Sequence, residues 1–220
     1  MKSQTSGISM RRIVVGLDAS EQARDGLRLA RSLAAGTGAE LIVAAAFGPV
    51  VAGPGVDLAR LQGRYFTEVF GAAASELGDA GFERRELRDV SAPRGLDRIA
   101  AAENADLIVV GSSHRGDVGR VLFGSVAERL LHGAPCSVAV APRGYAGEHL
   151  GAGIIGVAYD GSPESRLALD GARELATLLG GGLRLITAAV PEETAGPAHP
   201  RGPAKRGALM SIVPRDGEIK

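Results

Sequence analysis

Short apolar runs alternate with segments of helical periodicity along residues 12–141. Five runs are typical of strands: residues 12–18, 40–46, 84–90, 106–111 and 137–141. Most are apolar without polar alternation, which indicates strands buried on both faces of a parallel sheet, whereas the more polar run at 84–90 suits an edge. Four intervening segments repeat apolar residues at helical spacing: residues 20–36, 58–77, 93–100 and 125–132. The pattern predicts an α/β fold, an open five-stranded parallel sheet with helices on both faces.

The pattern then restarts, because residues 13–20 align without a gap on residues 155–162. The alignment continues at the same offset beyond these segments, and it places Asp18 on Asp160. A repeat of this kind indicates a second copy of the same unit. Only a strand, a helix and a strand of that copy follow, so we predict a partial second βαβ unit without a phosphate loop of its own.

We therefore expect five segments along the chain. They are a flexible N-terminus (1–11), a complete domain (12–143), a linker (144–153), a partial repeat (154–190) and a Pro- and Gly-rich tail (191–220). The composition of the tail is typical of disorder, although the apolar island at 208–213 either pairs as a strand or makes a transient contact. A strand–helix–strand unit cannot bury both faces of its strands alone. The partial repeat should therefore dock on the first domain or on another chain, or stay loosely folded.

The composition is that of a globular chain, with 45% hydrophobic and 23% charged residues. Equal numbers of basic and acidic residues, 25 of each, give a formal net charge of zero and favour neither nucleic acid nor a membrane as a partner. The first ten residues are too polar for a signal peptide, and no apolar run approaches the ~20 residues that cross a bilayer. The single cysteine, Cys136, indicates a cytoplasmic protein, and its apolar surroundings predict a packed thiol rather than a reactive one.

The segment from Val110 to Val126 is the one that best suits ligand chemistry, since it joins the clearest strand to a helix. Its glycines are Gly111, Gly116, Gly119 and Gly124. Glycines allow positive φ angles and a close approach of the backbone to a ligand, and a helix start offers N–H groups and a positive dipole end. With Arg115 and Arg120 adding charge, the segment suits a phosphate group. The alternative is a tight connection that binds nothing.

Two other phosphate-binding motifs do not fit. A Walker A loop needs Lys-Ser/Thr where this loop has Asp117-Val118. The letters of a dinucleotide fingerprint occur at residues 151–156, but they precede a strand instead of joining a strand to a helix. No paired carboxylates and no nucleophile with a neighbouring base emerge from the sequence.

These features together resemble the universal stress protein family, over residues 12–142 and again over 154–189. That family has a first strand ending in Asp, a matching second strand and a late Gly-x2-Gly-x9-Gly-Ser/Thr signature. Gly111 matches its first glycine, and Gly124 and Ser125 match its final pair. The resemblance implies a tandem member with an incomplete second copy. It also implies an adenine nucleotide alpha hydrolase-like fold with ATP across the carboxyl ends of the strands, where open parallel sheets bind ligands.

By position, the resemblance assigns residues to each part of the nucleotide. They are Gly16, Leu17 and Asp18 for the adenosine end, Ala46 for adenine, and Val110, Gly111, Gly124, Ser125 and Val126 for the phosphates. The family's second glycine falls on His114, which either crowds the phosphates or donates to one of them. Arg115 would add charge, and Gly116 would restore backbone freedom. Asp18 also has a simpler interpretation as a turn or cap residue before a helix.

The resemblance implies an ATP-binding stress or signalling protein that hydrolyses ATP slowly at most, with Mg²⁺ as a companion ion. The alternative is a nucleotide-free member that acts as a dimerising interaction module, which His114 and the incomplete second copy would favour. A true enzyme of the wider superfamily is disfavoured because no catalytic constellation emerges. We expect one nucleotide site per chain, a homodimer, and neither nucleic acid nor a membrane as a partner.

Overall fold

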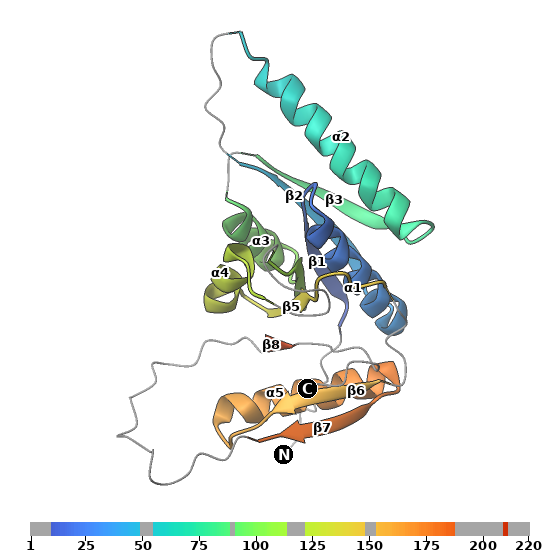
Figure 1. Ribbon diagram of the computed structural model, residues 1–220, viewed down its shortest axis with the longest axis vertical. Coiled ribbons are helices and arrows are strands. Elements are labelled where there is room, and N and C mark those ends of the chain that lie inside the picture. Colours follow the sequence, from blue (N-terminus) through green and yellow to red (C-terminus); the bar gives the residue numbers. More distant parts are fainter. Residues whose placement is uncertain are drawn as a thin grey trace, which may run out of the picture.

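The computed structural model describes residues 10–48, 55–88, 91–113, 122–147, 153–187 and 209–210. Within these ranges strands and helices follow one another in the order that the hydrophobic pattern predicts (Figure 1). The strands are β1 (Arg12–Leu17), β2 (Glu40–Phe47), β3 (Phe82–Arg88), β4 (Leu107–Gly111), β5 (Ser137–Ala141), β6 (Ile154–Ala158), β7 (Gly182–Ile186) and β8 (Leu209–Met210). The helices are α1 (Glu21–Thr37), α2 (Leu58–Leu77), α3 (Ala92–Ala102), α4 (Ser125–Gly133) and α5 (Pro163–Leu179).

The main sheet has the strand order β3-β2-β1-β4-β5, and all of these strands pair in parallel. The prediction of a five-stranded parallel sheet is therefore confirmed. The short strand β8 adds a sixth strand, because Leu209 pairs with Val138 and Met210 with Ala139 of β5. Of the two interpretations of the apolar island at 208–213, the structure thus supports pairing for these two residues.

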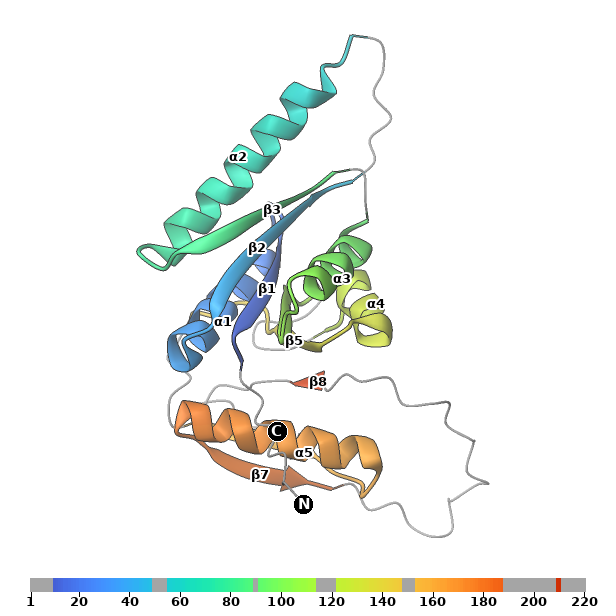
Figure 2. The same ribbon diagram turned by 180° about the vertical axis from the view of Figure 1, so that it is seen from behind.

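Alternate residues of the central strands point to opposite faces of the sheet, and each face has its own core. Helices α1 and α2 cover one face and α3 and α4 the other (Figures 1 and 2). Residues on the first face include Ile13, Val15, Leu41, Val43, Leu107 and Val109; those on the second include Val14, Ile42, Ile108, Val110, Val138 and Val140. Burial on both faces explains why these strands read as continuous apolar runs.

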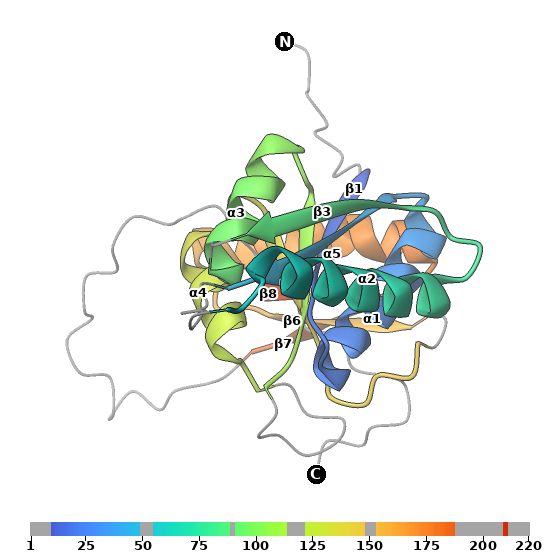
Figure 3. The same cartoon turned by 90° about the horizontal axis from the view of Figure 1, so that it is seen from above.

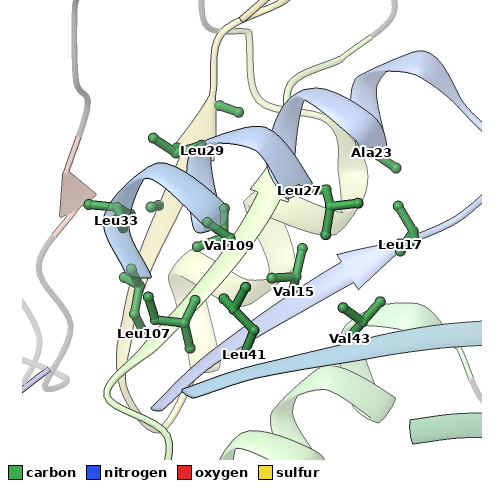
Figure 4. Packing of buried hydrophobic residues seen from close by; sticks show 14 of the residues in the cluster. Val15, Leu17, Ala23, Leu27, Leu29, Leu33, Leu41, Val43, Leu107 and Val109 are labelled. Carbon is green, nitrogen blue, oxygen red and sulfur yellow. The ribbon is translucent and has the colours of Figure 1, made fainter. Parts of the chain in front are cut away.

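Helix α1 provides the centre of the first core. Its side chain Leu27 points toward Val15 of β1, as Figure 4 shows, and both residues are fully buried. Ala23, Leu27 and Ala30 follow the helical repeat, so this stripe of α1 covers the sheet. Ser20 begins the helix by accepting a hydrogen bond from the Ala23 N–H at 3.2 Å, and Gly38 ends it with a φ of 74°.

Strand β3 differs in its bounds from the predicted run at 84–90. It begins at Phe82 because pairing with β2 extends from Leu41 opposite Phe82 to Phe47 opposite Arg88. Residues 89–90 lie outside the described residues. Charged side chains dominate this edge, where the Arg84 guanidinium stacks over the ring of Phe82 at 5.4 Å. The polar composition of β3 is that of a solvent-facing edge strand.

Strands β6 and β7 pair in parallel as a separate two-stranded sheet on α5, so the expected partial βαβ unit is present. The unit lies near the amino ends of the main strands, behind the main sheet when the molecule is seen from above (Figure 3). Ile155, Val157 and Leu175 join the same buried cluster as α1. The unit therefore docks on the first domain in this structure.

The second unit repeats the first at the level of single hydrogen bonds. Arg12 pairs with Glu40 in the first unit, and Ile154 pairs with Gly182 in the second, so the register is the same when the two sequences are aligned. The caps repeat as well: Ser162 accepts from the Ser165 N–H at 3.1 Å, and the glycine that ends α5, Gly180, has a φ of 64°. The sequence repeat thus corresponds to a repeat of register and capping.

Hydrogen bonds attach the first residues after the main domain to α1. The Gly144 N–H donates to Asp25 Oδ2 at 2.7 Å, and Arg28 donates to Asp25 Oδ1 at 3.1 Å. Burial raises the pKa of Asp25, while these two hydrogen bonds act to lower it. Tyr145 is buried in the core beside them. The expected linker therefore includes residues with a packing role.

Candidate functional site

A cavity of about 520 Å³ opens at the carboxyl ends of β1, β2 and β4. The sheet order places β1 between β2 and β4, so the direction of strand addition reverses there; ligands of open α/β sheets bind at such a point. The cavity is lined by every predicted site residue within the described ranges: Gly16, Leu17, Asp18, Ala46, Val110, Gly111, Gly124, Ser125 and Val126. His114, Arg115 and Gly116 lie outside the described residues.

The lining also includes residues that the sequence did not indicate. They are Ser20, Gln22, Ala23, Ala44, Leu87, Ala92, Leu96, Ser112, Ser113, Phe123 and Ala127. Ala44 could have been found, because it lies two residues before Ala46 on the same face of β2. Leu87 and Leu96 could not, since nothing in their local sequence says that β3 and α3 close over the end of β1.

One end of the cavity is apolar. Leu87 of β3, Leu96 of α3 and Ala44 of β2 line it. Gly16 makes room for this wall, because a Cβ at Gly16 would lie 2.9 Å from Leu96 Cδ1 and 3.2 Å from Val110 Cγ1. A flat apolar group is the ligand part that such a wall accommodates.

The other end of the cavity contains the start of α4. Its N-cap is Gly124, which makes no side-chain hydrogen bond, whereas Ser20, Asp57 and Ser162 cap α1, α2 and α5 with a side chain. The intrahelical pattern starts with the Glu128 N–H, which donates to Gly124 O at 2.9 Å. The preceding N–H groups, those of Ser125, Val126 and Ala127, have no intrahelical acceptor. Free N–H groups at a helix start, together with the helix dipole, favour an anion.

The loop before α4 returns close to the end of β4. The Ser113 N–H donates to Leu122 O at 2.7 Å, and a Cβ at Gly124 would lie 3.7 Å from Ser113 Cα. Both Gly124 and Ser113 line the cavity, so a side chain at position 124 would contact Ser113 beside the α4 N–H groups.

Gly111 has a packing role in addition to lining the cavity. A Cβ at Gly111 would overlap the Gln22 carbonyl, and a Cβ at Gly26 would lie 3.0 Å from the Gly111 N. Glycine at these positions lets α1 approach the end of β4. Neither Gly111 nor Gly124 has a positive φ, so the expected left-handed backbone is not the reason for glycine at either position.

Asp18 acts as a turn residue and also lines the cavity. Its Oδ1 accepts a hydrogen bond from the Ser20 N–H at 2.8 Å, and Asp160 makes the same contact with Ser162 at 3.0 Å. Tyr65 of α2 donates to Ala46 O at 3.2 Å. Burial raises the pKa of Tyr65, and the charge of Asp18 raises it further. Helix α2 thus anchors the end of β2 beside the cavity.

The cysteine is outside the cavity. Cys136 packs against the core that α3 and α4 cover, and burial raises the pKa of its thiol to about 11. The thiol is therefore protonated near neutral pH and has little nucleophilic character. Among the described residues, no group of three His, Cys, Asp or Glu side chains could hold a metal ion. Within the same ranges, no helix combines the length and apolar character that a bilayer crossing requires.

The sheet order and the cavity define an α/β protein with a cavity at the point where strand addition reverses. The family model "Universal stress protein family" matches residues 10–142, more than half of the chain. The chain belongs to the universal stress protein family.

Similar proteins support this assignment. A universal stress protein of Mycobacterium tuberculosis is 36% identical over 105 residues, a match that covers 42% of this chain and 35% of that protein. The chain therefore spans about a third of the length of this relative. A universal stress protein of Thermus aquaticus is 30% identical over 129 residues, covering 57% of this chain and 94% of that protein.

Solved structures share the fold. A universal stress protein from Archaeoglobus fulgidus superposes with a TM-score of 0.65 at 22% identity, covering 85% of this chain and 69% of that chain. A protein from Pseudomonas aeruginosa, described as a putative universal stress protein, gives a TM-score of 0.55 at 19% identity, with 83% and 63% covered. Identities at this level show the arrangement of the backbone and nothing about ligands.

Proposed function

We propose that this chain binds an adenine nucleotide, ATP in the first instance, and acts as a cytoplasmic stress or signalling protein. The observation that carries the proposal is one cavity with two ends of different chemistry. Leu87 and Leu96 form an apolar wall at one end, and the start of α4 has uncapped N–H groups at the other. A nucleotide has the same division, with a flat base at one end and phosphates at the other.

The lining residues divide accordingly. Ala46, Leu87 and Leu96 would contact the base, and Gly16, Leu17 and Asp18 the remainder of the adenosine end. The phosphates would lie against Val110, Gly111, Gly124, Ser125 and Val126. His114, Arg115 and Gly116, outside the described residues, complete the assignment. Mg²⁺ would arrive with the phosphates, whose oxygens are its usual ligands.

We propose a binding function with slow hydrolysis at most. Asp18 is the only titratable side chain in the described lining of the cavity, and its Oδ1 already accepts the Ser20 N–H. A general base must lie within hydrogen-bond reach of the attacking water. We assign Asp18 to the adenosine end, away from the phosphates where that water would attack, which favours nucleotide retention over turnover.

Nucleotide binding can be tested directly. The purified protein is denatured and the released small molecules are identified; the native protein is titrated with ATP·Mg²⁺ by calorimetry. Ser125→Asp places a negative charge at the first residue of α4, where a helix dipole favours it but a phosphate does not. We expect at least a tenfold loss of ATP affinity at unchanged stability, roughly 1.4 kcal/mol of binding free energy. Thr67→Asp, the same charge change at an exposed position on α2, should have no effect.

Nucleotide binding is ruled out if denaturation releases no adenine nucleotide and the melting temperature does not rise at millimolar ATP·Mg²⁺. Sustained rapid turnover of ATP would instead contradict the binding-only assignment.

A second candidate, a dimerising interaction module of the tandem type with an incomplete second copy, is favoured by one observation. The β6–α5–β7 unit exposes large apolar side chains: Ile154, Leu167, Leu178, Leu185 and Ile186. Solvent-exposed apolar groups concentrated on one unit are typical of interaction surfaces. We propose that they mediate a homodimer.

Analytical ultracentrifugation tests the homodimer. The Ile186→Glu variant should be a monomer, while Leu61→Glu, at an exposed apolar position on α2, should stay dimeric. A parent protein that is itself monomeric would contradict the proposal.

A further inference from the structure

We propose that the hydroxyl of Ser112 donates a hydrogen bond to the phosphate group bound at the start of α4. The inference rests on the proposed nucleotide binding and adds a ligand contact that neither the sequence motif nor the glycines indicate. Ser112 follows the last residue of β4 and lines the cavity.

The hydroxyl of Ser112 is buried without a partner among the described residues. The residue is 6% exposed, and its Oγ makes no hydrogen bond there. The other buried polar side chains of the described chain, those of Asp25, Gln62 and Ser165, all have partners. A buried hydroxyl without a partner lowers stability, so a position that keeps one is a candidate for an intermolecular bond.

The direction of Ser112 agrees with this role. Side chains alternate along β4, and the position of a Cβ at Gly111 points toward Gln22 of α1. Ser112 therefore points to the opposite side, where α3 and α4 cover the sheet. The hydrogen bond from the Ser113 N–H to Leu122 O holds the two ends of the intervening loop together, so the end of β4 lies beside the start of α4.

Together these groups make a set of donors of one kind. The N–H groups of Ser125, Val126 and Ala127 point out of the helix end, and a serine hydroxyl can rotate to donate toward the same acceptor. Within the described ranges, the Oδ1 of Asp97 is the other buried side-chain atom without a partner, but Asp97 does not line the cavity. An oxyanion is the acceptor that suits several converging donors, and the phosphate of a nucleotide supplies it.

The test compares two buried serines. Ser112→Ala removes the hydroxyl without a partner, and Ser165→Ala removes one that donates to Ser162 O at 3.0 Å. For Ser112→Ala we expect an unchanged or higher melting temperature without ligand, a rise of about tenfold in the Kd for ATP, and an unchanged Kd for adenosine. For Ser165→Ala we expect a lower melting temperature and an unchanged Kd for ATP. Ser112→Cys keeps the volume with a weaker donor and should change ATP binding in the same direction, even if the alanine variant folds poorly.

The outcomes separate this inference from the function on which it rests. If Ser112→Ala binds ATP as tightly as the parent protein, or melts earlier without any change in Kd, the hydroxyl is structural and the inference is wrong. If the parent protein binds neither ATP nor adenosine, nucleotide binding itself fails and the role of Ser112 fails with it.

Discussion

Two strand–helix–strand units of this protein, β1–α1–β2 and β6–α5–β7, share strand register, helix caps and turn hydrogen bonds at equivalent positions. Their surroundings differ. β1 lies between β2 and β4, with helices on both of its faces, whereas β6 pairs only with β7 within the described residues. The two units thus share their local interactions and differ in how much of each their neighbours bury.

The residues on the second face of each unit show this difference in burial. In the first unit Val14 and Ile42 are buried against the α3 side of the sheet. The equivalent positions in the second unit are Gly156, which is exposed, and Arg184, which is also exposed. At these two positions the second unit therefore lacks the buried aliphatic side chains of the first, and the neighbouring Ile154 and Ile186 on that face are exposed. Within the described residues, it also contributes nothing to the lining of the 520 Å³ cavity, which lies at the opposite end of the main sheet.

The largest difference between the two units should appear at equivalent leucines. Leu27 is fully buried in α1, and its counterpart Leu169 in α5 is only partly buried. We expect Leu27→Ala to cost about 2–5 kcal/mol of unfolding free energy, and Leu169→Ala less than half of that. Urea denaturation followed by circular dichroism measures both. Equal losses would mean that the second unit is as well packed as the first.

A smaller effect is expected where α1 approaches β4. Gly26→Val would push a side chain against the backbone of Val110 and Gly111, at a cost of about 1–3 kcal/mol. The equivalent residue, Ala168, lines a smaller cavity of about 140 Å³ between the two units, so Ala168→Val should cost no more than the lower helix propensity of valine, under about 1 kcal/mol. Urea denaturation followed by circular dichroism measures both losses of unfolding free energy. A tolerated valine at position 26 would show that α1 does not need its close approach to β4.

The smallest difference is expected at the helix caps. Ser20 and Ser162 accept the same hydrogen bond, at 3.2 and 3.1 Å. Each alanine variant should lose about 1 kcal/mol, and the two losses should be equal because the cap is local. Thermal unfolding without nucleotide is the appropriate measurement, since Ser20 also lines the cavity. Clearly unequal losses would show that the surroundings alter the stability contributed by even this local hydrogen bond.

Much of the fold could be predicted from the hydrophobic pattern. The strands β1, β4 and β5 are buried on both faces and therefore read as unbroken apolar runs. The bounds of β3 could not be read in this way, because its residues face solvent and its ends depend on pairing with β2. Local composition carries little information about an edge strand whose length is set by its neighbour.

The candidate site could be predicted from the sequence to a similar extent. Gly16, Ala46 and Gly124 come from three separate strands or loops, yet they line one cavity because the carboxyl ends of parallel strands meet at one edge. Leu96 and Ser112 were missed, since no motif marks a helix side chain that covers the cavity or a hydroxyl that loses its partners on burial.

By itself, the sequence determined the alternation of strands and helices, the internal repeat and the helix caps, because each can be recognised from residues that are close along the chain. The tertiary structure alone decided that Gly111 is required by the approach of α1 and that Ser112 is left without a partner among the described residues. It also decided that Leu209–Met210 extends the sheet beside β5. These outcomes depend on contacts between distant segments, whose energies arise from packing and desolvation once the chain has folded.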